Sequence, residues 1–124
     1  MEKPQAPGLS DSTLSALWRS AVLHRGGYQC VICGHGGTLE CHHVIKRRYR
    51  LLFFDHRNGV PVHAGDCHSM ADKMGTDVAH DDRDYLLRIS RLTKKECLRG
   101  EGLSETEWRR QVKVALLAEL GGKG

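Results

Sequence analysis

The stretch from residue 30 to residue 45 decides the fold of this chain. It contains the paired cysteines of Cys30-Val31-Ile32-Cys33 and the paired histidines of Leu39-Glu40-Cys41-His42-His43-Val44-Ile45. More side chains with nitrogen or sulfur atoms follow downstream, at Asn58, His63, Cys67 and His68. Thiolate and imidazole groups are preferred ligands of zinc and other transition metals. This concentration therefore predicts two metal sites, one that stabilises the fold and one that does chemistry.

Length and composition indicate one small domain. A chain of 124 residues has room for one hydrophobic core. It contains only two Phe, two Trp and three Tyr, so we expect a small core that a bound metal helps to stabilise. Lys and Arg number 19 against 15 Asp and Glu, and the net charge of +4 favours a polyanionic partner only weakly.

The sequence predicts a soluble, cytoplasmic protein with no membrane partner. It has no apolar run long enough to cross a bilayer, and residues 1–8 lack the apolar stretch of a signal peptide. Its five cysteines are an odd number, and two of them form a Cys-x2-Cys pair. Thiolate ligation in a reducing compartment explains such cysteines better than disulfides do.

Hydrophobic periodicity predicts an α+β fold. Residues 1–9 hold all but one of the prolines and are expected to be flexible. A helix follows, from a cap at residues 10–12 to the stop at Gly26-Gly27. The other expected elements are a short extended arm over residues 28–33 that ends in a Cys-x2-Cys-Gly turn, strands over 38–45 and 60–62, and helices over 68–74, 82–98 and 104–120.

Cys30 and Cys33 form half of a tetrahedral structural zinc site, which needs four Cys or His ligands. The spacing makes Cys67 the third ligand. The candidates for the fourth are His63, Cys41 and His35.

His63 is favoured as the fourth ligand because the spacing His63-x3-Cys67 can close a turn opposite the Cys-x2-Cys pair. Cys41 is the next choice, but a strand alternates its side chains and so turns Cys41 and His42 to opposite sides. We expect Cys41 to pack as a small apolar residue. Cys97 stands alone on a helical segment and is also assigned to packing.

Taken together, these motifs resemble the HNH endonuclease family, whose fold is a ββα-metal motif. The resemblance covers residues 17 to 74, slightly under half of the chain. It implies one nuclease domain over residues 10–124, in which a zinc-stabilised ββα-metal core at 17–74 has an N-terminal helix and a C-terminal helical extension at 80–120.

The chain departs from the family pattern in two places. Family members commonly have Cys-x2-Cys-His after the second strand, whereas this chain has His63-x3-Cys67-His68. Either residue type binds zinc, so we expect the structural site to be retained. The basic loop after His43 also contains the large apolar residues 51–54, for which the sequence predicts no location.

The resemblance also implies roles for four residues. His42 and His68 would bind a catalytic divalent ion, His43 would be the general base, and Asn58 would orient the loop and the base. A neutral imidazole has a pKa near the working pH, as a base that activates water requires. Since adjacent strand residues point apart, His42 and His43 can both reach one site only if the strand bends at its end.

Asp72 is a tentative third ligand of the catalytic ion. It falls four residues after His68, which places both on one face of a helix. A solvated carboxylate on a helix surface explains the residue equally well. A shell of His and carboxylate ligands suits Mg²⁺, Mn²⁺ or another first-row divalent ion.

The expected substrate is double-stranded DNA, nicked one strand at a time by a monomer or a homodimer without a small-molecule cofactor. The basic residues that follow His43 are expected to contact the phosphate backbone; they are Lys46, Arg47, Arg48 and Arg50. Two alternatives stay open. One is a noncatalytic zinc-finger-like module that binds nucleic acid or protein, and the other is RNA cleavage by the same site.

Overall fold

The computed structural model describes residues 8–46 and 51–121. Within them it shows a mixed α+β fold with five α-helices and one two-stranded antiparallel sheet, so the predicted class is confirmed. The elements in chain order are α1 (Asp11–Arg25), β1 (Glu40–His43), η1 (His56–Asn58), β2 (Gly59–Val62), α2 (Asp66–Met74), η2 (Gly75–Val78), α3 (Arg83–Ser90), α4 (Lys94–Gly100) and α5 (Glu105–Glu119), where η marks a 3-10 helix.

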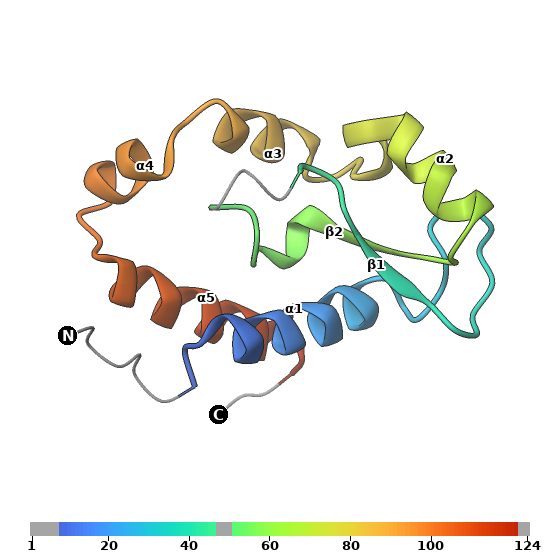
Figure 1. Cartoon of the computed structure of the whole chain (residues 1–124), viewed down its shortest axis with the longest axis horizontal. Helices are drawn as coiled ribbons and strands as arrows, with labels where there is room; N and C mark the ends of the chain where they lie inside the picture. The colour runs from blue at the N-terminus through green and yellow to red at the C-terminus, as the bar shows by residue number, and fades with distance from the viewer. Residues whose placement is uncertain (1–7, 47–50, 122–124) are drawn as a thin grey trace.

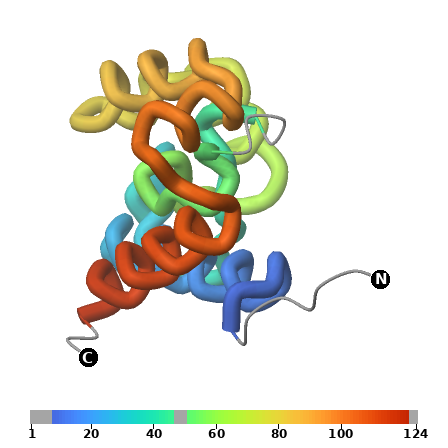
Figure 2. The backbone as a smooth tube through the Cα atoms, turned by 90° about the vertical axis from the view of Figure 1, so that its left-hand side faces the viewer, coloured from blue at the N-terminus to red at the C-terminus, as the bar shows by residue number. Residues whose placement is uncertain are grey.

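The sheet lies between two groups of helices. Helices α1 and α5 lie side by side along one edge of the molecule, and α2 and α3 lie on the other side of the strands (Figures 1 and 2). Helix α4 connects α3 to α5 at the end of the molecule away from α2 (Figure 1). None of the helices in the described part of the chain has both the length and the apolarity that crossing a membrane requires.

Helix α1 forms where its cap and its apolar periodicity predict it. The Ser10 hydroxyl accepts a hydrogen bond from the backbone N–H of Thr13, which satisfies one of the unpaired donors of the first turn. Its buried side chains recur at helical spacing and are Leu14, Trp18, Ala21 and Val22. Trp18, Ala21 and Val22 share a core cluster with Leu116 of α5. This packing holds α1 against α5.

The close approach of α1 to the sheet requires a glycine at position 59. In the antiparallel register His43 pairs with Gly59 and His42 with Val60. A Cβ atom at Gly59 would lie 2.5 Å from Val22 Cγ2 and 2.7 Å from Trp18 Cζ2, far inside normal contact distance. The absence of a side chain therefore lets α1 lie directly against the strand pair.

The apolar residues of the basic loop, whose location the sequence did not predict, belong to the core. Leu52 is fully buried in the cluster that contains Val60 and Val62 of β2. Phe54 is also buried, against Leu14 of α1 and Trp108 of α5. The end of the loop thus anchors the chain on both sides of the sheet.

Three of the expected elements were wrong in their extent. The expected turn at residues 30–34 is present, since the backbone N–H of Gly34 bonds to the carbonyl of Cys30. The extended arm before it is absent, because Tyr28 has a left-handed φ of 58° and belongs to the turn that ends α1. The first strand is only Glu40–His43, the residues that β2 can pair. The single helix expected at 82–98 is two helices.

The break between α3 and α4 has a local cause. The Thr93 hydroxyl accepts from the backbone N–H of Glu96, and the Glu96 carboxylate accepts from the backbone N–H of Thr93. This capping box starts a new helix and gives Thr93 an extended backbone. Helix α2, in turn, begins at Asp66, two residues before the expected start, so Cys67 and His68 both lie in its first turn.

Candidate metal centres

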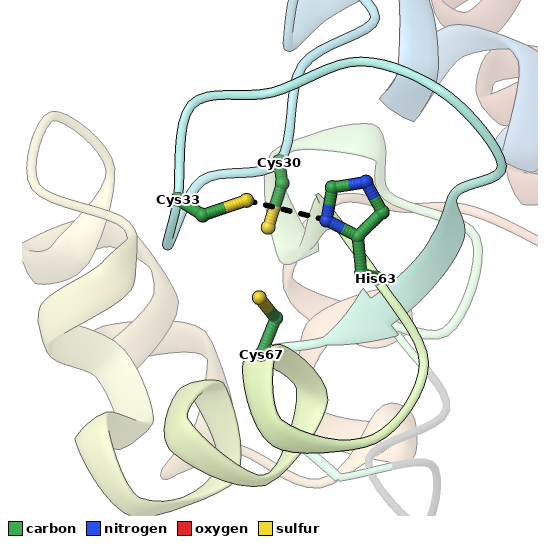
Figure 3. A group of neighbouring side chains, drawn as sticks. All are labelled: Cys30, Cys33, His63 and Cys67. Atoms are coloured by element: carbon green, nitrogen blue, oxygen red, sulfur yellow. Dashed lines mark hydrogen bonds between the residues drawn. The ribbon is translucent and has the colours of Figure 1, made fainter.

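The four residues expected to bind structural zinc lie together. Their ligand atoms, from Cys30, Cys33, His63 and Cys67, are all within 4.8 Å of one another. Figure 3 shows the three sulfur atoms and the imidazole of His63 pointing toward a common centre. Cys30 and Cys33 come from the turn after α1, His63 follows β2, and Cys67 lies in α2. A metal held here would join three separate segments.

The imidazole of His63 is oriented for this role. Its Nε2 is 2.7 Å from the backbone carbonyl oxygen of Gly36, and since a carbonyl only accepts, Nε2 carries the proton. Nδ1, which lies 3.2 Å from Cys33 Sγ, then faces the cluster with its lone pair. Such a hydrogen bond on the outer nitrogen is typical of metal-binding histidines. Cys41, the alternative fourth ligand, instead directs its thiol to the carbonyl of Arg19 at 3.6 Å.

The pKa values of the thiols reflect how closely the sulfur atoms are gathered in the cluster. Burial alone would raise the pKa of Cys30, but backbone N–H groups of Cys33, His63 and Ile32 lower it to about 6. Burial and the neighbouring Cys30 and Cys33 raise the pKa of Cys67 to about 11. Thiolates this close repel one another unless a cation lies between them. The three Cys and one His are a donor set that can bind zinc.

A second group of potential ligands also includes residues from the first two turns of α2, on a different face of the helix from Cys67. The ligand atoms of His42, His68 and Asp72 are within 4.8 Å of one another. His42 comes from β1 and is 6% exposed, and its Nδ1 lies 3.6 Å from Asp72 Oδ1. The rings of His42 and His68 meet edge to face, with centroids 4.9 Å apart. The predicted helical spacing of His68 and Asp72 therefore does bring them to one site.

The surroundings of His42 favour its neutral form. Burial lowers its pKa, and the nearby His68 lowers it further, while the charge of Asp72 acts in the opposite direction. A neutral imidazole has the lone pair that a metal ligand needs.

Glu40 orients His68, a contact that the sequence reasoning missed. Its Oε1 lies 2.8 Å from His68 Nδ1, so a protonated Nδ1 donates to the carboxylate and Nε2 keeps its lone pair. Strand alternation could have found this residue, because positions 40 and 42 of one strand face the same side. A carboxylate paired with a metal-binding histidine is a common arrangement.

His43 faces the opposite side of β1 from His42, as strand alternation requires. Its ring stacks on Trp18 with centroids 4.0 Å apart and planes 9° apart. Its Nε2 lies 3.0 Å from the carbonyl oxygen of Phe53, so Nε2 carries the proton and Nδ1 is the unprotonated nitrogen of the neutral ring. Strand β1 ends at His43, and the chain bends at the next two residues. This bend follows the histidine pair, so His42 and His43 themselves keep the alternating sides of a regular strand.

His43 and His68 both line one hollow on the surface, in spite of this alternation. The hollow has a volume of about 420 Å³ and lies between α1 and β1. Its lining residues are Ser15, Trp18, Arg19, Glu40, Cys41, His43, Phe53, Phe54 and His68. His68 of the second ligand group and the stacked imidazole of His43 thus border the same space.

Asn58 holds the loop from which Phe53 comes. Its side chain is 0% exposed and bonds to both ends of the segment between residues 45 and 52. Oδ1 accepts from the Ile45 backbone N–H at 2.6 Å, and Nδ2 donates to the carbonyls of Ile45 and Leu52 at 3.0 Å each. Asn58 therefore does not line the hollow. It fixes the backbone that positions the carbonyl partner of His43.

The predicted DNA contacts fall largely outside the described residues. Arg47, Arg48 and Arg50 lie in the undescribed segment, and Lys46 is exposed at its edge. The predicted flexible N-terminus also falls mainly on residues that are not described, 1–7.

Comparison of the chain with protein-family models, with curated proteins and with solved structures found no match. Its function must therefore be inferred from its own residues.

Proposed function

We propose that this chain is a metal-dependent HNH endonuclease that hydrolyses phosphodiester bonds of DNA on a ββα-metal core. The observation that carries the proposal is the hollow that His43 and His68 share, since it brings one imidazole to the same space as a member of the His42, His68 and Asp72 ligand group. Phosphodiester hydrolysis needs these two components, a base for water and a cation near the phosphate.

The two ligand groups have different roles in this proposal. Cys30, Cys33, His63 and Cys67 would hold a structural zinc ion that joins the turn after α1 to β2 and α2. His42, His68 and Asp72 would hold a divalent ion such as Mg²⁺ or Mn²⁺. That ion, when bound, supplies positive charge next to the scissile phosphate and the leaving oxygen. The mixed nitrogen and oxygen donors suit a first-row divalent ion.

His43 is the general base of the proposed reaction. Nδ1 takes a proton from the attacking water, and the carbonyl of Phe53 accepts the Nε2 hydrogen bond before and after this transfer. The Trp18 ring, stacked at 4.0 Å, restricts rotation of the imidazole. The indole Nε1 of Trp18 donates to the Asp55 carbonyl at 2.8 Å, which fixes the indole in turn. Asn58 is a positioning residue that acts through the loop.

DNA is the proposed substrate because a basic segment follows His43, which lines the hollow, closely in the sequence. Lys46 and the arginines at 47, 48 and 50 would contact phosphates that flank the cleavage site, without base specificity. One site of this kind cuts one strand, so a monomer nicks duplex DNA and a homodimer is needed to cut both strands together. A reducing compartment such as the cytoplasm would keep the five free cysteines available.

The test is to incubate supercoiled plasmid with the protein and Mg²⁺ or Mn²⁺. We expect the wild type to nick, EDTA to stop nicking, and His43→Ala to lower the rate by about 10²–10⁴-fold, the usual contribution of a general base. His80→Ala is the matched control, because His80 does not line the hollow.

Two outcomes would contradict the proposal. Equal nicking by His43→Ala and wild type would exclude the proposed base. A fully inert wild type that still contains zinc would favour a noncatalytic zinc-binding module. A parallel incubation with single-stranded RNA decides whether the site discriminates between the two nucleic acids.

A further inference from the structure

Helix α1 forms one wall of the hollow, against the side of β1 that carries Cys41 and His43. Ser15 and Arg19 both line the hollow, and their spacing of four residues places them one above the other on one face of α1. Trp18, between them in sequence, is the residue that stacks on His43. The helix that positions the imidazole therefore also brings a guanidinium group to the same space.

Arg19 is the only arginine or lysine among the described residues that line this hollow. Within residues 8–46 and 51–121 it forms no ion pair, whereas the guanidinium groups of Arg57 and Arg109 lie 2.9 and 2.7 Å from carboxylate oxygens. An arginine with no carboxylate partner keeps its charge available for an anion.

Arg19 borders Cys41, another residue that lines the hollow. The thiol of Cys41 lies 3.6 Å from the backbone carbonyl oxygen of Arg19. The carboxylate of the hollow, Glu40, is bound to His68 at 2.8 Å and so does not pair with Arg19. The hollow thus has a guanidinium on one wall, an imidazole base, and a metal-ligating histidine.

We propose that Arg19 binds the scissile phosphate itself and stabilises the charge that develops on it during cleavage. This inference rests on the proposed nuclease function. The planar guanidinium can donate two parallel hydrogen bonds to the two nonbridging oxygens of a phosphodiester. Donors of fixed orientation that face developing negative charge lower the activation barrier more than they strengthen substrate binding.

The reaction balances without a further reagent. The oxygen of water forms a bond to phosphorus while its proton passes to Nδ1 of His43. The bond from phosphorus to the leaving sugar oxygen breaks, and its electron pair stays on that oxygen, which takes a proton from solvent. Arg19 exchanges no proton and contributes only hydrogen bonds and charge.

The test compares Arg19→Gln, Arg19→Lys and the control Arg99→Gln, since Arg99 is an exposed arginine on α4 and does not line the hollow. Single-turnover nicking at saturating protein measures the chemical step. Binding to a fluorescent duplex, measured in the His43→Ala background, gives DNA affinity separately. Thermal melting reports the fold.

Arg19→Gln should lower the saturating rate by about 10²-fold, as loss of one charge-stabilising donor does. Its DNA affinity should fall by less than about tenfold, because the contact is one among several to phosphates. Arg19→Lys should recover part of the rate, since it keeps the charge but loses the paired donors. Arg99→Gln should change neither quantity.

Three results would overturn the role of Arg19. The first is a saturating rate of Arg19→Gln equal to that of the wild type. The second is a loss of affinity with an unchanged saturating rate, which would make Arg19 a contact to a flanking phosphate. The third is a lowered melting temperature that Arg19→Lys does not restore. An inert wild type would instead contradict the nuclease function, and the role of Arg19 with it.

Discussion

The two potential ligand groups of this protein share one helix and differ in chemistry. In each, the ligand atoms lie within 4.8 Å of one another, and α2 contributes to both, through the adjacent residues Cys67 and His68. The first group has three sulfurs and one nitrogen from three separate segments, which is a complete tetrahedral set. The second has two nitrogens and one carboxylate, and the side chain of Asp72 is 69% exposed.

In the proposed function, one short helix serves both stability and chemistry. A complete set of four ligands leaves no position for water or substrate, so an ion there contributes mainly to folding. An incomplete set beside a hollow leaves such positions, as a reactive ion requires. The following predictions test whether the two groups can be separated experimentally.

The largest expected effect is that of Cys30→Ser on folding. This change removes one ligand of the sulfur-rich group, and structural zinc sites contribute about 10–16 kcal/mol to folding in small domains. We expect loss of the cooperative thermal transition by circular dichroism and loss of bound zinc. Cys97→Ser, a change on α4 outside both groups, is the control and should melt like the wild type. Equal melting and zinc content of Cys30→Ser and wild type would contradict the structural role.

Chelation should distinguish the two groups, because the ions bound to them should exchange with solution at different rates. Brief exposure to EDTA should lower nicking by about 10²-fold or more, because an open site loses its ion readily. Zinc content, measured by mass spectrometry, and the melting temperature should both stay unchanged. Added Mn²⁺ should then restore nicking. If zinc loss, unfolding and inactivation proceed at one common rate, the distinction between the groups is wrong.

Gly59→Ala tests how α1 packs against the strand pair and leaves every potential metal ligand in place. The new methyl group would collide with Val22 and Trp18, so we expect the free energy of unfolding to fall by about 1–3 kcal/mol. Urea denaturation measures this change, and zinc content should be unaffected. The control is Gly100→Ala, at a position with no neighbouring atom within 4 Å of the added Cβ. Unfolding midpoints that fall equally in both variants would argue against a special role for Gly59.

The smallest expected effect is that of Asp72→Asn on the second group. The variant keeps the shape of the side chain but loses its negative charge, so we expect Mn²⁺ affinity to fall by about tenfold. A titration followed by electron paramagnetic resonance measures the free Mn²⁺. Asp77→Asn, in η2, is the control, since Asp77 is not among the second group's ligands. Unchanged Mn²⁺ affinity in Asp72→Asn would mean that Asp72 is not a ligand and that the group consists of His42 and His68 alone.

Much of the secondary structure could be predicted because its determinants are local. The cap at Ser10 and the spacing of Leu14, Trp18 and Val22 define α1 without reference to the rest of the chain. The same holds for α5, which starts after the Ser104 cap. The break at Thr93 also has a local cause, but the apolar periodicity across residues 82–98 hid it.

The spacing of residues in the sequence also predicted which of them belong to the two ligand groups. Cys30 and Cys33 share one turn, and His68 and Asp72 share one helix face, so each pair meets whatever the rest of the chain does. The choice of His63 over Cys41 followed from the spacing His63-x3-Cys67, with strand alternation as the argument against Cys41, and the structure brings His63 into the sulfur-rich group. The same alternation places Glu40 on the side of β1 that carries His42, and there Glu40 contacts His68.

The amino-acid sequence by itself determined the kinds of ligand, their local pairing and the helices and strands that carry them, because these depend on residues a few positions apart. Only the tertiary structure decided that Trp18 stacks on His43, that Phe53 supplies its carbonyl partner, and that Arg19 faces the same hollow. These contacts join segments distant in the chain. Their geometry depends on how α1 packs against Gly59, and no local sequence pattern predicts that packing.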